Sequence, residues 1–142
     1  MTTTATDAWE ALHRAQITVN RRATRFPEFA ELPAREYDVL FNLTRTDDNG
    51  MRLKELNQYL PITQSTLSRM LDRLERKGLV RKWEDPDDAR GLRITLTDLG
   101  HDVQERIARD YDQHIHQLIT TALTPDEQHT LIRLTTKPRT SI

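Results

Sequence analysis

The sequence of 142 residues predicts a mainly α-helical fold, and three observations support this. Residues 64–76 repeat apolar side chains at helical spacing and place polar and basic side chains on the opposite face. Residues 79–97 contain two β-compatible runs separated by a turn-rich loop. Residues 98–122 carry a continuous apolar stripe that is too long for one small core. Together they predict a winged helix-turn-helix with a helical dimerisation region, built from about six helices and a two-stranded wing.

The composition limits the possible classes of protein. No cysteine is present, which excludes disulfides, thiolate metal sites and thiol-based redox sensing. No segment approaches the roughly 18 apolar residues of a membrane span, and no basic stretch leads into an apolar run at the start, so a cytoplasmic location is expected. The net charge is −1, yet residues 52–93 carry ten Lys or Arg against seven Asp or Glu. The remainder is acidic, which predicts that nucleic acid would dock on one face only.

Two helices are predicted in the first third of the chain. The first runs from Asp7 to about Arg25, and Asp7 with Glu10 resembles a capping box at its start. Pro27 interrupts it, because proline lacks the amide hydrogen that the helix needs. The second helix begins near Pro33, a residue suited to the first helical position.

The next two helices have the spacing of a helix-turn-helix. A short helix from about Lys54 to Tyr59 is followed by a break and then by the helix of residues 64–76, so that a turn of about three or four residues joins them. Thr63 occupies the N-cap position and Gly78 the position of a left-handed stop. Leu67, Met70, Leu71 and Leu74 form the apolar face of the second of these helices. Its polar face could read DNA and consists of Gln64, Ser65, Ser68, Arg69, Asp72, Arg73 and Arg76.

The segment that follows predicts a wing and then two further helices. Residues 79–83 and 92–97 are expected to be strands, and the loop between them is tipped with Arg90. The helix of residues 98–122 would extend about 37 Å at about 1.5 Å per residue, so part of its apolar stripe needs a partner. A last helix opens at Thr124, and residues 137–142 are expected to be a frayed tail.

Three motifs in register carry a resemblance to a known family. They are Ser65-Thr66-Leu67-Ser68-Arg69 leading to Leu74-Glu75-Arg76-Lys77-Gly78-Leu79-Val80, then Asp85-Pro86-Asp87-Asp88-Ala89-Arg90-Gly91, then Leu96-Thr97-Asp98-Leu99-Gly100. Their order and spacing resemble the recognition helix, wing and entry to the long helix of the MarR family of bacterial transcription regulators. The resemblance implies dimerisation segments at residues 1–32 and 98–142, and a DNA-binding lobe at residues 33–97. Leu32, where a capping residue is expected, and the short last helix depart from the family pattern.

The resemblance also implies which residues contact DNA. The family binds a pseudo-palindromic operator as a homodimer, and the N-terminal end of each recognition helix approaches the base edges. The base-reading residues implied are Gln64, Ser65, Thr66, Ser68 and Arg69. The phosphate contacts implied are Arg52, Lys54, Arg73 and Arg76. Arg90 would enter the minor groove, with Asp88 as the acid that orients it.

A small aromatic or phenolic effector that releases the operator is a further implication of the resemblance. The family places an effector pocket between the dimer helices and the DNA-binding lobe. The aromatic side chains nearest to this place in the sequence are Trp9, His13, Tyr37 and Phe41, for which core packing is the alternative role.

The predicted function is sequence-specific transcriptional regulation, most simply repression of a promoter. No nucleophile–base pair, carboxylate pair or cofactor loop stands out, so neither an enzyme nor a cofactor is expected. Five histidines leave a metal site as an alternative, but His114 and His116 would point about 200° apart on a helix, and no metal is expected. Two other functions remain open, a winged-helix protein-interaction module and an effector-independent DNA-binding factor.

Overall fold

The computed structural model describes residues 3–141 and is mainly helical, which confirms the predicted fold class. The helices are α1 (Thr4–Ala23), η1 (Pro27–Ala30, a 3₁₀ helix), α2 (Ala34–Leu43), α3 (Leu53–Gln58), α4 (Gln64–Arg76), α5 (Asp98–Ala122) and α6 (Pro125–Ser141). The strands are β1 (Met51–Arg52), β2 (Val80–Asp85) and β3 (Asp88–Leu96). Residues 1, 2 and 142 lie outside the described residues. They are the outer ends of the predicted dimerisation segments 1–32 and 98–142.

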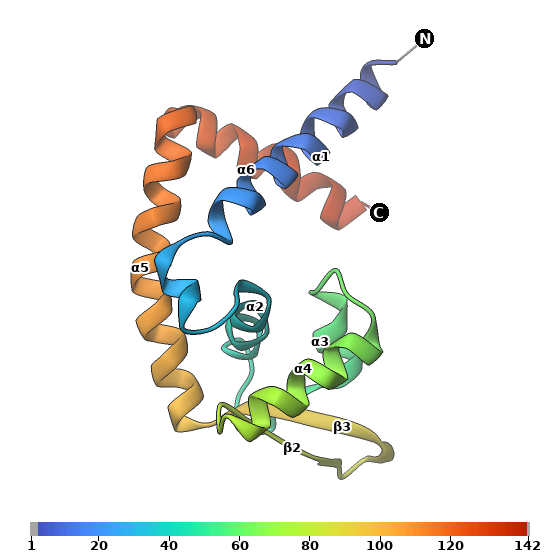
Figure 1. The fold of residues 1–142 in the computed structure, drawn as a ribbon. Coiled ribbons are helices and arrows are strands. Elements are labelled where there is room, and N and C mark those ends of the chain that lie inside the picture. Colours follow the sequence, from blue (N-terminus) through green and yellow to red (C-terminus); the bar gives the residue numbers. More distant parts are fainter. Residues whose placement is uncertain (1–2, 142) are drawn as a thin grey trace.

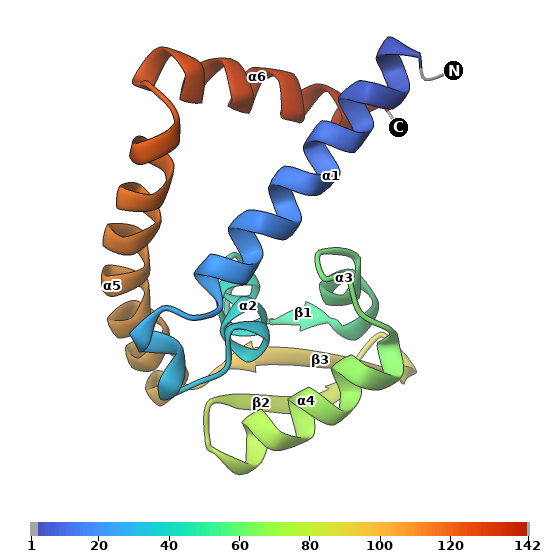
Figure 2. The same cartoon turned by 45° about the horizontal axis from the view of Figure 1, so that its top comes forward.

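The elements form a compact lobe and a set of extended helices (Figure 1). The lobe contains α2, α3, α4 and the sheet, and α5 runs along one side of it. α1 extends away from the sheet, and α6 begins at the end of α5 that is farther from the sheet and runs back across the molecule (Figures 1 and 2). The end of the molecule opposite to α6 therefore presents α4 and the β2–β3 hairpin.

The core of the lobe contains the apolar side chains that recur at helical spacing in the sequence. The four predicted apolar residues of α4, Leu67, Met70, Leu71 and Leu74, are all buried, which confirms that face. They pack in one cluster with residues from the other elements of the lobe and from α5, among them Val39, Leu40, Leu56, Ile94 and Ile107. Each such side chain stabilises the fold by about 1.5–3 kcal/mol, so this cluster holds α4 in place.

Both ends of α4 have the predicted caps. At the start, the Thr63 hydroxyl accepts a hydrogen bond of 3.2 Å from the Thr66 amide. At the end, Gly78 has a φ of +77°, and the amides of Gly78 and Leu79 donate to the carbonyls of Glu75 and Leu74, each at 2.9 Å. This pair of hydrogen bonds is a Schellman motif, which needs the left-handed conformation that glycine adopts without strain.

The sheet has three antiparallel strands in the order β1-β3-β2. The predicted two-stranded wing is β2 and β3, which pair from Val80 opposite Leu96 to Asp85 opposite Asp88. The additional strand β1 pairs Met51 with Ile94 and was not predicted, because two residues are too short to show an alternating pattern. The other strands are also longer than predicted.

The longer strands change the place of Arg90. It was expected at the tip of a loop but lies within β3, and the turn is shorter, at Pro86 and Asp87. The Asp85 carboxylate accepts a 2.9 Å hydrogen bond from the Asp87 amide, and the Asp88 carboxylate accepts a 3.0 Å bond from the Arg90 amide. Side-chain bonds of this kind stabilise a tight turn, which allows strand pairing to continue into the loop residues.

The predicted start of the first helix is wrong. α1 begins earlier, with the Thr3 hydroxyl accepting from the Thr6 amide at 3.3 Å. Glu10 forms an ion pair of 3.1 Å with Arg14, one turn further along, so Asp7 and Glu10 do not form a capping box. A threonine in the preceding Thr-rich stretch supplies the cap instead, which adds a turn to the helix.

The long helix is as predicted, whereas the frayed tail is not. α5 spans Asp98–Ala122 with Thr97 as its N-cap. α6 continues through Pro138 to Ser141, where residues 137–141 were expected to fray. Proline removes only one hydrogen bond of the helix, and Arg139 lies near the C-terminus, where the helix dipole favours a cation.

Candidate nucleic-acid interface

The N-terminal half of α4 presents the polar side chains predicted to read bases. Gln64, Ser65 and Arg69 are exposed, and Thr66 and Ser68 are half-buried. The Thr66 hydroxyl accepts hydrogen bonds from the Thr63 hydroxyl at 2.9 Å and from the Arg69 guanidinium at 3.4 Å. Thr66 therefore helps to hold the start of the helix, and the Ser65 hydroxyl also lies 3.1 Å from that of Thr63. Gln64 and Arg69 keep exposed side chains.

The C-terminal half of α4 is tied to its neighbours by charge. Glu36 of α2 is buried, and its carboxylate lies 3.4 Å from Lys77 and 3.7 Å from Arg73. Arg73, a predicted phosphate contact, keeps half of its side chain exposed. These ion pairs connect α4 to α2 and leave Arg73 able to face a ligand.

An acid–base pair joins α4 to the wing. Asp72 accepts a hydrogen bond from Lys82 of β2, which holds the pKa of the Asp72 carboxyl below its usual range. Lys82 is thereby partly neutralised. Within residues 3–141, Arg69 and Arg76 take part in no ion pair, so the cationic charge of α4 is least compensated at these two positions. Lys54, the remaining predicted phosphate contact, is exposed on α3.

Arg90 lies on the wing, whose strand β2 packs against α4. Arg90 is exposed in β3, three residues beyond the turn. Asp88 was expected to orient its guanidinium, but its carboxylate accepts from the Arg90 backbone amide. Asp88 thus shapes the strand that carries Arg90, and the long side chain stays free to extend from it.

A buried carboxylate holds the base of the wing. Asp85 is 3% exposed and lies 2.7 Å from the Nε atom of Arg52 and 3.3 Å from that of Arg93. The Asp87 amide, and then the two guanidinium groups, hold the pKa of the Asp85 carboxyl below its usual range. Arg52, predicted as a phosphate contact, is therefore anchored to the wing while its side chain remains 45% exposed. The anchoring role of Asp85 was not predicted, because its partners Arg52 and Arg93 are distant in sequence or on another strand.

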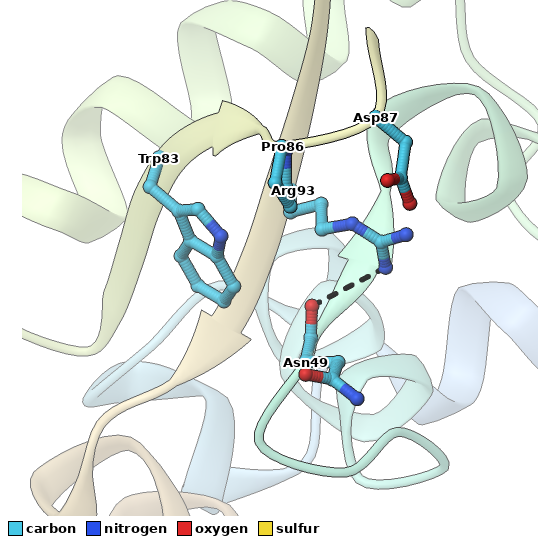
Figure 3. Close-up of a pocket in the computed structure, with 5 residues that line it drawn as sticks. All are labelled: Asn49, Trp83, Pro86, Asp87 and Arg93. Atoms are coloured by element: carbon cyan, nitrogen blue, oxygen red, sulfur yellow. Dashed lines mark hydrogen bonds between the residues drawn. The ribbon is translucent and has the colours of Figure 1, made fainter.

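A small pocket of about 240 Å³ lies next to this ion-pair cluster (Figure 3). Arg93 points across it and donates to the carbonyl oxygen of Asn49 at 3.3 Å. The Trp83 ring forms another wall of the pocket. The Arg81 guanidinium lies over this ring, 5.0 Å from its centroid. These contacts fix the wing to the turn before β1, and Trp83 has a packing role there.

A second cavity, of about 430 Å³, lies between α2 and α5 and is called the interhelix pocket below. Its lining residues are Tyr37, Asp38, Phe41, Gln104, Ala108, Tyr111 and Asp112. Two of the four predicted effector residues, Tyr37 and Phe41, thus lie in it. Trp9 and His13 instead stack on each other on α1, with ring centroids 5.4 Å apart.

The polar groups of the interhelix pocket are partly dehydrated. Burial raises the pKa of the Tyr37 and Tyr111 hydroxyls. The Gln104 amide donates to the Tyr37 hydroxyl at 3.5 Å. The residues from α5 were not predicted for this site, although Tyr111 was visible in the apolar stripe of that helix.

The histidines do not gather into a metal site. His114 of α5 pairs instead with Glu28 of η1, with 2.8 Å between Nδ1 and the carboxylate. Across residues 3–141, no group of three or more His, Asp or Glu side chains is arranged to hold a metal ion. The same part of the chain contains no helix with the length and apolar character needed to cross a membrane.

The fold, together with the polar face of α4 and the wing, defines a protein of the winged helix-turn-helix class. A family model described as "MarR family" matches residues 31–91. A mutant MarR from E. coli complexed with operator DNA is 31% identical, with a TM-score of 0.75 and coverage of 89% of this chain and 92% of that one. This chain belongs to the MarR family.

Two further relatives show how far the similarity extends. The multiple antibiotic resistance protein MarR of Escherichia coli (strain K12) is 40% identical over 77 residues, which are 54% of each chain, so the match spans about half the length of this curated relative. Sco3205, a MarR family transcriptional regulator from Streptomyces coelicolor solved in complex with DNA, is 28% identical with a TM-score of 0.81. The match covers 98% of this chain and 89% of the Sco3205 chain.

Proposed function

We propose that this protein is a DNA-binding transcriptional regulator that represses a promoter by occupying it as a homodimer. The observation that carries the proposal is the polar face of α4 with the wing next to it, since the wing carries the exposed Arg90. α4 and the β2–β3 hairpin lie side by side in both views (Figures 1 and 2). A helix that enters the major groove would bring such a wing over the neighbouring minor groove.

The side chains of this surface divide into two roles. Glutamine can pair bidentately with adenine and arginine with guanine, so Gln64 and Arg69 are the main base-reading residues, with Ser65, Thr66 and Ser68 beside them. Phosphate contacts position the protein without specifying sequence. The residues proposed for this second role are Arg52, Lys54, Arg73 and Arg76. Arg90 is proposed to enter the minor groove, with Asp88 supporting its backbone.

Two solved relatives support binding to DNA. Sco3205 is described in complex with DNA, and the mutant E. coli MarR in complex with operator DNA. The matches cover 98% and 89% of this chain, respectively.

The extended helices support a homodimer. In the described part of the chain, α1 buries only Ala23 and α6 buries no residue. Trp9 is 60% exposed and Ile132 is 61% exposed, and Leu12, Ile17, Leu131 and Leu134 are also exposed on these helices. In proteins most of the stability of a helix comes from the packing of its apolar face, so a second copy is proposed to cover these helices. Residues 1–32 and 98–142 would then dimerise, and residues 33–97 would bind DNA.

A small aromatic ligand is proposed to control the dimer through the interhelix pocket. The pocket joins α2 of the lobe to α5 of the dimerisation region, and Tyr37, Phe41 and Tyr111 line it. A ligand that fits one spacing of these helices better than another would shift the population toward that spacing. Release follows if that spacing no longer matches half-sites about 34–36 Å apart.

Titration of labelled promoter DNA over a salt series tests the proposal. Phosphate contacts release counterions, so the logarithm of the binding constant should fall linearly with the logarithm of the salt concentration. Promoter DNA should also bind more tightly than a scrambled duplex of the same length. Absence of DNA affinity at low salt would refute the proposal and favour a protein-interaction module.

A further inference from the structure

We propose that the interhelix pocket selects a small aromatic cation, an amine or a quaternary ammonium compound, rather than an aromatic acid. The inference rests on the proposed function, because it names the ligand class of the proposed effector site. It follows from the charges, the rings and the connections of the pocket wall.

The charged groups of the wall are all acidic. Asp38 lies on α2 and Asp112 lies on α5, on opposite sides of the cavity, and the lining includes no lysine, arginine or histidine. A ligand carboxylate would meet two like charges without a compensating cation. A ligand cation would lie between two opposite charges, so electrostatic complementarity favours it.

The rings of the wall also favour a cation. Tyr37 lies between Phe41 and Tyr111, with ring centroids 6.4 Å and 5.7 Å away. The face of an aromatic ring carries partial negative charge and attracts ammonium and guanidinium groups. The Phe41 ring already has the Arg45 guanidinium 5.4 Å from its centroid, although Arg45 does not line the pocket.

The partial dehydration of Asp38, although its side chain is not fully buried, adds to this preference. Removal of water raises the pKa of the Asp38 carboxyl. An ionised carboxylate that has lost part of its hydration gains more from an opposite charge than one in bulk water. The Gln104 amide and the Tyr37 hydroxyl provide neutral polar contacts for the rest of such a ligand.

The pocket is connected to the recognition helix. Glu36 precedes Tyr37 in α2, and its buried carboxylate contacts Arg73 and Lys77 at the end of α4. A ligand that shifts α2 against α5 would therefore displace the partners of Glu36. This contact gives a cation in the pocket a direct route to the DNA-binding surface.

Isothermal titration calorimetry with three probes of similar size tests the inference: benzyltrimethylammonium, benzyl alcohol and benzoate. The ammonium compound should bind about tenfold or more tightly than either of the others. In the variants Asp38→Asn and Asp112→Asn, the preference for the ammonium compound should fall by about tenfold or more. Asp110→Asn is the control, because it removes an exposed acid of α5 outside the lining, and its preference should equal that of the native chain.

The same preparations are titrated with promoter DNA without a probe, and their thermal midpoints confirm folding. Benzoate binding as tightly as the ammonium compound, the same preference in all three variants, or no binding of any probe would overturn the inference. If DNA binding persists in those cases, the proposed function stands and only the ligand class fails. If the native chain does not bind promoter DNA, the proposed function is refuted instead.

Discussion

The hydroxyl of Thr97 donates a hydrogen bond of 2.6 Å to the carbonyl oxygen of Gly78, which joins the start of α5 to the end of α4. The same hydroxyl accepts from the Gly100 amide at 3.0 Å, as the N-cap of α5. A Cβ atom on Gly100 would lie 2.0 Å from the Leu79 carbonyl oxygen, so the two elements approach as closely as their backbones allow. The end of α4 and the start of α5 are thus joined directly, without a flexible linker.

Replacing Thr97 with alanine should destabilise the protein by about 1–2 kcal/mol, because α5 loses its N-cap and the Gly78 carbonyl loses a donor. Urea denaturation measures this as a lower midpoint. Thr120→Ala is the matched control, since that hydroxyl only bonds back to carbonyls of its own helix. Equal midpoints for the two variants would contradict the role of Thr97.

Arg90→Ala should weaken binding to promoter DNA and reduce the salt dependence by about one counterion, because one cationic contact is lost. Fluorescence anisotropy at several salt concentrations measures both quantities. Arg133→Ala removes the same charge from α6, away from the wing, and should change neither. Unchanged affinity in Arg90→Ala would remove Arg90 from the proposed interface.

Asp85 should make the stability of the lobe depend on pH. Its pKa is lowered in the folded protein relative to an unfolded value of about 3.9, so its charged form stabilises the fold above that pH. The contribution is lost as the pH falls below the unfolded value toward the folded one. Asp85→Asn should lower the unfolding midpoint at neutral pH and flatten its decline below about pH 5.

The control for this prediction is Asp87→Asn, because the Asp87 side chain is exposed and only its backbone amide contacts Asp85. Chemical denaturation at a series of pH values compares the two variants. A parallel pH dependence in the native chain and Asp85→Asn would show that the buried carboxylate does not stabilise the wing.

Ile132→Glu and Trp9→Glu should each shift the protein from dimer to monomer, because a charge would enter the apolar faces of α6 and α1. Sedimentation velocity measures the change. Tyr59→Gln, which removes a 55% exposed aromatic ring from the lobe, should leave the dimer intact. A native chain that sediments as a monomer would refute the proposed dimer.

Features that depend on near neighbours in sequence were predictable. The apolar spacing of α4, the Thr63 cap and the Gly78 stop all reside within one helix and its flanking residues. The length of α5 follows from a continuous stripe of 25 residues. Periodicity and capping act over a few residues, so the linear pattern contains them.

Features that join distant segments were not predictable. β1 exists only because Met51 pairs with Ile94, and two residues show no pattern of their own. Arg52 looks like a solvent-facing cation until the fold brings it to within 2.7 Å of Asp85. The short turn of the wing, which places Arg90 in a strand, likewise depends on side-chain bonds and strand pairing.

The sequence by itself determined the order of the helices, the apolar and polar faces of α4 and the family resemblance, because these are encoded by local spacing. The tertiary structure alone decided the interhelix pocket, which combines Tyr37 and Phe41 of α2 with Gln104 and Tyr111 of α5. It also decided which arginines are neutralised by ion pairs, since Glu36 pairs with Arg73, and Asp85 pairs with Arg52 and Arg93, between segments distant in sequence. Charge and shape at a site depend on distances in space, which the linear order of residues does not contain.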